Sequence, residues 1–170
     1  MKIKLIIFDL DDTLLDTTRL LIPIARTQAF EDRIVQPLPL MTGAKENLDY
    51  LRDKYDLVLL TQGRPEAQQK KVKSLGIGDY FKKQYFADPS VNETKAQYFQ
   101  KIIDDSGLPA ANIISIGNRR YTDIREAKKL GMNTCLFHYG EHADEKVAQN
   151  EDVPDFTVIN HKELIPKCQL

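Results

Sequence analysis

The sequence predicts an α/β protein of the doubly wound, Rossmann-like class, in which a parallel sheet carries helices on both faces. Short, almost continuously apolar segments recur along the chain, which is typical of strands buried on both faces of a parallel sheet. Segments with helical spacing of apolar residues separate them, and this alternation favours the doubly wound arrangement. The length of 170 residues suits one compact domain, so we expect a single domain over residues 1–170.

The strands are expected where the apolar runs are densest. The first run, Ile3–Phe8, ends abruptly in carboxylates. A weaker candidate is Gln84–Phe86, which is short and partly polar. The other runs have the form of the first and are predicted as strands: Asp56–Thr61, Asn112–Gly117, Asn133–Phe137 and Phe156–Ile159.

Helices are expected between the strands, where apolar residues recur three or four positions apart. One helix is predicted from Pro65, with apolar residues at Ala67, Val72 and Leu75, and it stops before Gly76. Glycine also marks the ends of two later helices. The remaining helices are predicted from the apolar positions Ala44, Leu48 and Leu51; Ala96, Phe99, Ile102 and Ile103, before Gly107; and Ile124, Ala127 and Leu130, before Gly131.

An insertion of about residues 16–40 follows the first predicted strand. We expect it to hold one helix, which contains Leu20, Leu21, Ile24 and Ala25. The stretch Pro37–Pro39 marks its return to the main body. The apolar side of this helix can cover a ligand or pack on the core, and the sequence leaves both open.

Composition excludes several classes of function. The formal net charge of −1 provides no basic field for nucleic acid. No apolar run is long enough for a signal peptide or a membrane span, so we expect a cytoplasmic protein without a membrane partner. Cys135 and Cys168 have neither disulfide-framework nor metal-ligand spacing and are interpreted as reduced bystanders.

Polar residues gather where the predicted strands end. Asp9 and Asp11 follow the first strand, Thr61 ends the second, and Asn118 to Asp123 follow Gly117. The carboxyl ends of parallel strands share one edge, where ligands bind in such sheets. Carboxylates crowded there repel one another unless a cation neutralises them, and magnesium together with a substrate phosphate suits this chemistry.

A simpler interpretation of Asp9 and Asp11 is a turn in which aspartates cap backbone N–H groups. Thr61, with Gln62 and Gly63 after it, and Lys95 argue for a phosphate site instead, because they add donors and a cation at the same edge.

The chain resembles the haloacid dehalogenase-like superfamily over nearly its whole length. The four superfamily motifs occur in the right order: Phe8–Leu14, Leu59–Gly63, Lys95 and Gly117–Asp123. Further similarity lies after the second and fourth motifs, at Leu75–Phe81 and Ala127–Met132.

The resemblance implies a magnesium-dependent phosphatase. By this resemblance Asp9 attacks phosphorus, and Asp11 first protonates the leaving alcohol and then deprotonates the water that hydrolyses the aspartyl-phosphate. Thr61, Gln62, Gly63 and Lys95 would hold the phosphoryl group. The Mg²⁺ ligands implied are Asp9, the backbone carbonyl of Asp11, Asn118 and Asp123.

Asn118 departs from the superfamily pattern, which usually has aspartate there. An amide oxygen still binds magnesium, so weaker metal binding is expected rather than none. The alternative is a catalytically weakened binding or regulatory module. Lys95 is assigned by order and spacing, with three rival lysines nearby: Lys82, Lys83 and Lys101.

The short insertion predicts an open site. Such a site suits a bulky phosphorylated substrate, a phosphorylated macromolecule, or a homo-oligomer whose neighbouring subunit supplies the lid. Arg64, Arg119 and Arg120 could hold a second anionic group, although solvated arginine is the simpler interpretation of each. The histidines at 138, 142 and 161 have no ligand spacing and are given no chemistry.

Competing activities fit less well. Asp11 argues against a dehalogenase or phosphonatase, because those enzymes typically lack the second aspartate. A mutase would need a larger cap. A receiver domain would need its acceptor aspartate at a middle strand, where this chain has Thr61 and Gly117. The physiological substrate and the oligomeric state stay open.

Overall fold

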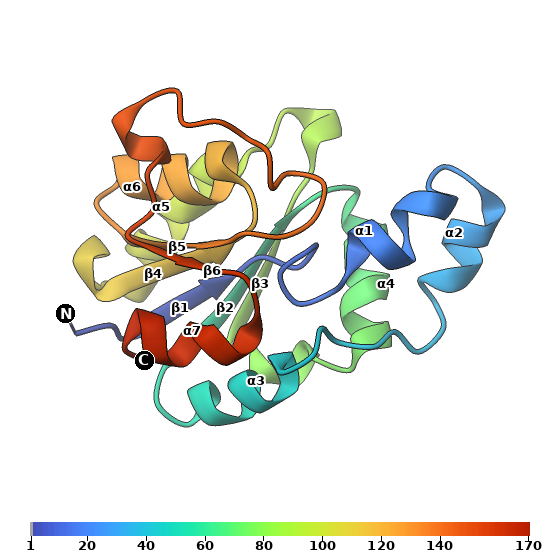
Figure 1. Ribbon diagram of the computed structural model, residues 1–170, viewed down its shortest axis with the longest axis horizontal. Helices are drawn as coiled ribbons and strands as arrows, with labels where there is room; N and C mark the ends of the chain where they lie inside the picture. Colours follow the sequence, from blue (N-terminus) through green and yellow to red (C-terminus); the bar gives the residue numbers. More distant parts are fainter. Residues whose placement is uncertain (1) are drawn as a thin grey trace.

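The computed structural model describes residues 2–170 and contains one parallel sheet of six strands (Figure 1). The order across the sheet is β3-β2-β1-β4-β5-β6, so the chain winds outward in both directions from β1. This confirms the predicted fold class. The strands are β1 (Leu5–Phe8), β2 (Asp56–Gln62), β3 (Lys83–Ala87), β4 (Ile113–Gly117), β5 (Asn133–Phe137) and β6 (Phe156–Val158).

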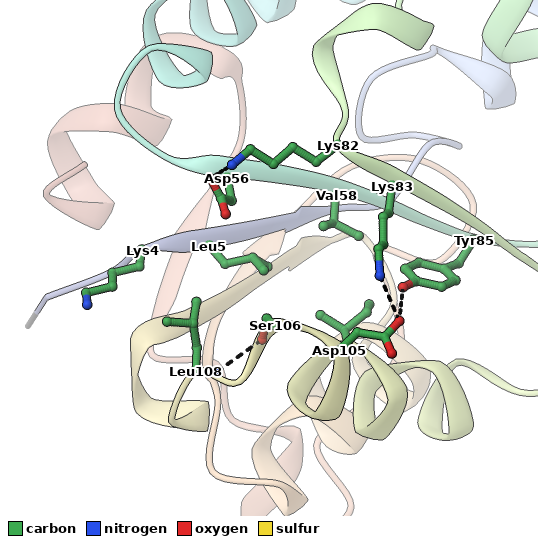
Figure 2. Close-up of a pocket in the computed structure, with 11 residues that line it drawn as sticks. Lys4, Leu5, Asp56, Val58, Lys82, Lys83, Tyr85, Asp105, Ser106 and Leu108 are labelled. Carbon is green, nitrogen blue, oxygen red and sulfur yellow. Dashed lines mark hydrogen bonds and ion pairs between the residues drawn. The ribbon is translucent and has the colours of Figure 1, made fainter.

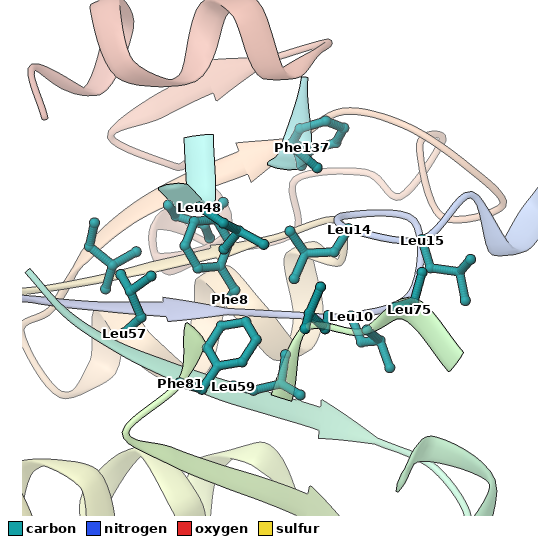
Figure 3. Packing of buried hydrophobic residues seen from close by; sticks show 14 of the residues in the cluster. Phe8, Leu10, Leu14, Leu15, Leu48, Leu57, Leu59, Leu75, Phe81 and Phe137 are labelled. Carbon is teal, nitrogen blue, oxygen red and sulfur yellow. The ribbon is translucent and has the colours of Figure 1, made fainter. Parts of the chain in front are cut away.

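Helices cover both faces of the sheet. The helices whose residues pack on the sheet are α3 (Ala44–Arg52), α4 (Pro65–Leu75), α5 (Lys95–Ser106), α6 (Arg125–Lys129) and α7 (His161–Cys168). Alternate residues of β1 belong to different cores: Ile6 and Phe8 pack with α3, α4 and α7, whereas Leu5 and Ile7 pack with α5 and α6. Figure 3 shows the first of these cores around Phe8. Both faces are therefore buried, as the unbroken apolar runs predicted.

The strand register aligns the carboxyl ends that matter for the site. Phe8 at the end of β1 pairs with Leu59 of β2 and with Ile116 of β4. Asp9, Thr61 and Asn118 follow these residues within two positions. The register therefore brings all three to the same edge of the sheet.

Several predicted boundaries differ from the structure. Ile3 and Asn112 lie outside β1 and β4, and Ile159 lies outside β6. Helix α7 was not predicted, because Pro166 interrupts its sequence pattern. Its buried Leu164 and Cys168 pack into the first core, so tertiary contacts stabilise a helix that local propensity disfavours.

The prediction of one helix in the insertion is wrong. The segment forms α1 (Thr17–Leu20), a 3-10 turn (Ile22–Ile24) that includes Pro23, and α2 (Gln28–Arg33). Proline cannot continue a helix begun before it, which explains the break. Leu21, Ile34 and Leu38 are buried in the first core, so the insertion packs against the main body.

No helix within residues 2–170 is both long and apolar enough to cross a membrane.

Candidate active site

The predicted site residues come together at the carboxyl edge of the sheet. Asp9 follows β1, Thr61 and Gln62 end β2, Lys95 is the first residue of α5, and Asn118 follows β4. A hollow of about 300 Å³ is lined by the following predicted residues: Asp9, Asp11, Thr61, Gln62, Gly63, Lys95 and Asn118. Asp123, the remaining predicted residue, is buried in a π-helical turn (Arg120–Ile124) and contacts Lys95.

Lys95 bridges two buried carboxylates. Its Nζ lies 2.7 Å from Asp9 Oδ1 and 2.5 Å from Asp123 Oδ1. A capping box between Thr94 and Gln97 begins α5 at this point and so places the lysine at the sheet edge. The rival lysines are elsewhere: Lys83 and Lys101 pair with Asp105, and Lys82 pairs with Asp56.

The Asp9 environment carries more negative than positive charge. Burial raises the pKa of Asp9 to about 7, and the nearby Asp123 carboxylate adds to this, while Lys95 opposes it. One ammonium thus faces two buried carboxylates. A divalent cation at this edge would relieve the imbalance.

The oxygen atoms at this edge are of the kinds that bind magnesium. Asp9 and Asp123 provide carboxylate oxygens, and the Asn118 amide adds a neutral one. Asn118 is buried and its Nδ2 donates to the Tyr139 carbonyl at 3.4 Å, which leaves the amide oxygen for a cation. Within residues 2–170 no three His, Cys, Asp or Glu side chains form a metal cluster. The donor set therefore depends on amide and backbone oxygens together with carboxylates, as magnesium sites commonly do.

Asp11 is held by residues that the sequence did not single out. Its Oδ1 accepts from Lys71 Nζ at 2.7 Å and from Thr17 Oγ1 at 2.5 Å, and its Oδ2 accepts from Gln68 Nε2 at 2.8 Å. Burial acts to raise the pKa of Asp11, but Lys71 and these hydrogen bonds outweigh it and hold the pKa below its usual value. Gln68 and Lys71 lie three positions apart on the buried side of α4, and polar residues on an apolar helix face were the signal available in the sequence.

The residues of the second motif make hydrogen bonds within the protein. Thr61 Oγ1 lies 2.6 Å from Gln68 Nε2. The Gly63 N–H donates to the Ala87 carbonyl at 2.9 Å and is therefore already used. Gly63 has φ of +154° and a side chain there would press on Gln68, so its role in the structure is to leave space.

The arginines at this edge are mostly engaged by the protein. Arg64 pairs with Glu31 of α2. Arg120 donates to the carbonyls of Glu145 and Asp152. Arg119 lines the hollow while its Nε lies 3.3 Å from Glu145, so it is the arginine placed to meet an anion there.

Loop residues after β5 also line the hollow. Glu141 and His142 were given no role by the sequence, yet both reach this site. Gly140 in the same loop packs against Asp12, whose carboxylate accepts from the backbone and hydroxyl of Thr18. The loop is thereby fixed to the segment that carries Asp9 and Asp11.

A second, larger hollow adjoins the first. It has a volume of about 580 Å³ and lies between the insertion and α4. Asp11, Gln62 and Gly63 line both hollows, so Asp11 stands at their junction. A phosphoryl group in the first hollow would have its leaving group beside Asp11.

A third hollow, of about 410 Å³, lies at the opposite edge, near the amino ends of β1 and β2 (Figure 2). Two of its lysines pair with carboxylates. Lys82 pairs with Asp56, and Asp105 accepts from Lys83 at 3.0 Å and from the Tyr85 hydroxyl at 2.9 Å. It holds none of the predicted site residues.

The fold and this site define a hydrolase of the haloacid dehalogenase-like type. The chain belongs to the haloacid dehalogenase-like hydrolase family, whose sequence model matches residues 25–137. The superfamily resemblance predicted from the four motifs is therefore confirmed.

Curated relatives with similar sequences include two archaeal enzymes. The glyceraldehyde 3-phosphate phosphatase of Pyrococcus abyssi is 29% identical, over 82% of this chain and 83% of its own. The enzyme of the same name from Pyrococcus furiosus is 27% identical, over 84% of each chain. The first alignment spans 198 positions, more than the length of this chain, so that relative contains residues within the aligned region that this chain lacks.

Solved structures share the fold. The HAD-hydrolase YfnB from Bacillus subtilis, bound to magnesium, superposes with a TM-score of 0.73 at 18% identity, covering 98% of both chains. A predicted phosphoglycolate phosphatase from Haemophilus somnus gives a TM-score of 0.77 at 18% identity and the same coverage.

Proposed function

We propose that this protein is a magnesium-dependent phosphomonoester hydrolase that forms an aspartyl-phosphate on Asp9. The observation that carries the proposal is the pairing of Lys95 with Asp9 and Asp123 in a polar hollow that Thr61 and Asn118 also line. The relatives that are glyceraldehyde 3-phosphate phosphatases support phosphate ester hydrolysis as the reaction.

In the first step a carboxylate oxygen of Asp9 attacks phosphorus and the ester oxygen leaves. Lys95 opposes the protonation of Asp9 that burial favours, and its ammonium can also meet a phosphoryl oxygen. The Thr61 hydroxyl lies at the same edge and can donate to a second oxygen. Charge that spreads over the phosphoryl group in the transition state is thus balanced by fixed donors.

Asp11 serves as acid and then as base. Its lowered pKa, held down by Lys71 and the hydrogen bonds, favours the ionised form before substrate binds. A substrate phosphate beside it adds negative charge, which favours a proton on Asp11 and so prepares it to protonate the leaving oxygen. The same carboxylate then accepts a proton from the water that attacks the aspartyl-phosphate, and phosphate is released.

Magnesium would be held by Asp9, the backbone carbonyl of Asp11, Asn118 and Asp123. When bound, it would neutralise negative charge on the carboxylates and on the phosphoryl oxygens. The excess of buried negative charge around Lys95 supports this assignment, as does the magnesium bound to YfnB, a protein of the same fold.

The substrate is proposed to be a phosphorylated compound, either a small molecule or a macromolecule. A small substrate is favoured by the names of the curated relatives, and a bulky one by the short insertion. The cytoplasmic location and a homo-oligomer that covers the site also stay predictions. A second candidate function, a weakened binding or regulatory module, is favoured by Asn118 alone.

Hydrolysis of p-nitrophenyl phosphate by the purified protein tests the proposal. We expect magnesium-dependent turnover, and we expect Asp9→Asn to lower kcat by at least about 10³-fold because it removes the nucleophile. Circular dichroism of the variant checks that it is folded. Activity without magnesium, or an active Asp9→Asn variant, would contradict the mechanism, and absence of turnover in the wild type would favour the binding module.

A further inference from the structure

Helix α4 carries a buried lysine that the proposed reaction does not yet use. Lys71 is 5% exposed and Gln68 is 2% exposed, and both lie on the helix face that otherwise buries Ala67, Val72 and Leu75. Burial of an ammonium is costly unless it is paired and hydrogen-bonded. The partner of Lys71 is the Asp11 carboxylate, at 2.7 Å.

The two carboxylate oxygens of Asp11 accept different numbers of hydrogen bonds. A carboxylate has about four lone-pair sites for hydrogen bonds. Oδ1 uses two of them, for Lys71 and Thr17, and Oδ2 uses one, for Gln68. One lone pair of Oδ2 therefore remains for a proton.

The same contacts connect Asp11 to the phosphate end of the site. Gln68 Nε2 lies 2.8 Å from Asp11 Oδ2 and 2.6 Å from Thr61 Oγ1. Asp11 itself lines both the 300 Å³ hollow and the 580 Å³ hollow beside the insertion. Asp11 is thus held at the junction where the leaving oxygen of a bound phosphomonoester would lie.

We propose that Lys71 is a positioning residue, which with Gln68 holds the Asp11 carboxylate so that Oδ2 delivers the proton to the leaving group. This inference rests on the proposed phosphatase function. A general acid works only within hydrogen-bonding reach of the atom that it protonates. Without Lys71 the Asp11 carboxylate loses one of the two donors that fix Oδ1 and is held less firmly in its orientation.

A positioning role of Lys71 and a purely electrostatic role predict opposite changes in the reaction rate of Lys71→Met. Removal of a neighbouring cation makes a carboxyl group easier to protonate. If only the charge of Lys71 mattered, Lys71→Met would therefore increase the fraction of Asp11 that carries a proton. The hydrolysis of esters that need protonation would then be faster. Positioning predicts the opposite, a slower reaction with those esters.

The test compares kcat/KM for two substrates at one pH with added magnesium. Glycerol phosphate releases an alkoxide that needs a proton, whereas p-nitrophenyl phosphate releases a stable phenolate that does not. Because kcat/KM reports the steps up to cleavage of the ester, the later attack of water does not enter. We expect Lys71→Met to lower kcat/KM about 10²-fold for glycerol phosphate and less than about threefold for p-nitrophenyl phosphate.

Two variants serve as controls. Lys70→Met removes the preceding lysine, which is half-buried and pairs with Glu66 at 2.7 Å rather than with Asp11, and should leave both values unchanged. Lys71→Arg keeps a cationic donor and should recover much of the activity with glycerol phosphate. If Lys71→Met does not fold, Thr17→Val removes the other Oδ1 donor at nearly constant volume and carries the same selective expectation.

Three results with a folded Lys71→Met variant would overturn the inference: an equal loss of kcat/KM for both substrates, no loss for either, or a gain for glycerol phosphate. None of them would contradict the phosphatase function. A wild type that hydrolyses neither substrate would instead refute the proposed function on which it rests.

Discussion

Asn118 places a neutral amide in a position where the superfamily pattern usually has an aspartate. It is 3% exposed and shares the sheet edge with Asp9 and Asp123, which Lys95 alone pairs. An amide adds no further negative charge in the absence of a metal, but it binds a divalent cation less strongly than a carboxylate does. Compared with an aspartate, this residue therefore lowers the affinity for magnesium and raises the stability of the metal-free protein.

We predict that Asn118→Asp tightens magnesium binding and destabilises the metal-free protein. A third buried carboxylate repels Asp9 and Asp123 when no cation is present, and its charge attracts magnesium when one is. The magnesium concentration at the midpoint of the rise in Tm should fall about tenfold. Asn112→Asp, at the opposite end of β4, is the matched control. An unchanged magnesium response would show that Asn118 is not a ligand.

Gly140 is required where two loops of the site meet. It has φ of +81°, and an added Cβ would lie 2.2 Å from Asp12 Oδ2. We predict that Gly140→Ala destabilises the protein by about 1–3 kcal/mol more than Gly76→Ala. Gly76 has φ of +67° and open space around it, so it carries the same backbone strain without the clash. Urea denaturation of the two variants measures the difference, and equal losses would exclude the clash.

At the scale of elements, Asp152 connects α6 to the loop before β6 through hydrogen bonds. Its carboxylate accepts from Arg125 Nε at 2.5 Å and Nη2 at 2.9 Å, and from the backbone N–H groups of Ala148 and Gln149. The bond to Arg125 is the main reason why the pKa of Asp152 falls to about 2, and the backbone N–H groups add to it. Because the folded-state pKa is below the ordinary value, the contribution to stability is present above about pH 4 and is lost as pH falls toward 2.

We predict that Asp152→Asn lowers the free energy of unfolding by about 2 kcal/mol at pH 7. The difference from wild type should narrow between pH 4 and pH 2, as the wild-type carboxyl group becomes protonated. Urea denaturation at pH 7, 4 and 2.5 measures it. Asp79→Asn, an exposed aspartate on a surface turn, should show no such pH trend. If the difference in the free energy of unfolding between wild type and variant stays constant with pH, the stabilisation by Asp152 does not come from its charge.

The elements also show where local sequence patterns predict structure well. Helix α4 begins at Pro65 and ends before Gly76, as expected, because both residues act through local backbone geometry. Helix α7 and the broken insertion were missed or wrong. The break in the insertion has a local cause, Pro23, whereas the stability of α7 depends on long-range packing of Leu164 and Cys168, which no local pattern reports.

At the scale of the whole molecule, one sheet separates two cores that share β1, β2 and β4. The insertion adds Leu21 and Ile34 to the first of these cores. We therefore predict one cooperative unfolding transition, with far-UV circular dichroism and the near-UV signal of the seven tyrosines changing together. Leu21→Ala should shift the whole transition and cost about 2–5 kcal/mol.

A separate early transition of the insertion would contradict this expectation. The single domain over residues 1–170 would then have to be divided, with the segment of about residues 16–40 as an independent unit.

The sequence by itself determined the parallel α/β fold and the identity of most residues at the edge of the sheet. Apolar runs report burial, and motif residues lie at strand ends: Asp9 and Asn118 directly follow β1 and β4, and Thr61 is the second-last residue of β2, so chain order alone brings them together. Only the tertiary structure decided the partners of Asp11. Lys71 and Gln68 are 60 and 57 positions away from it, and their meeting depends on how α4 packs on the sheet.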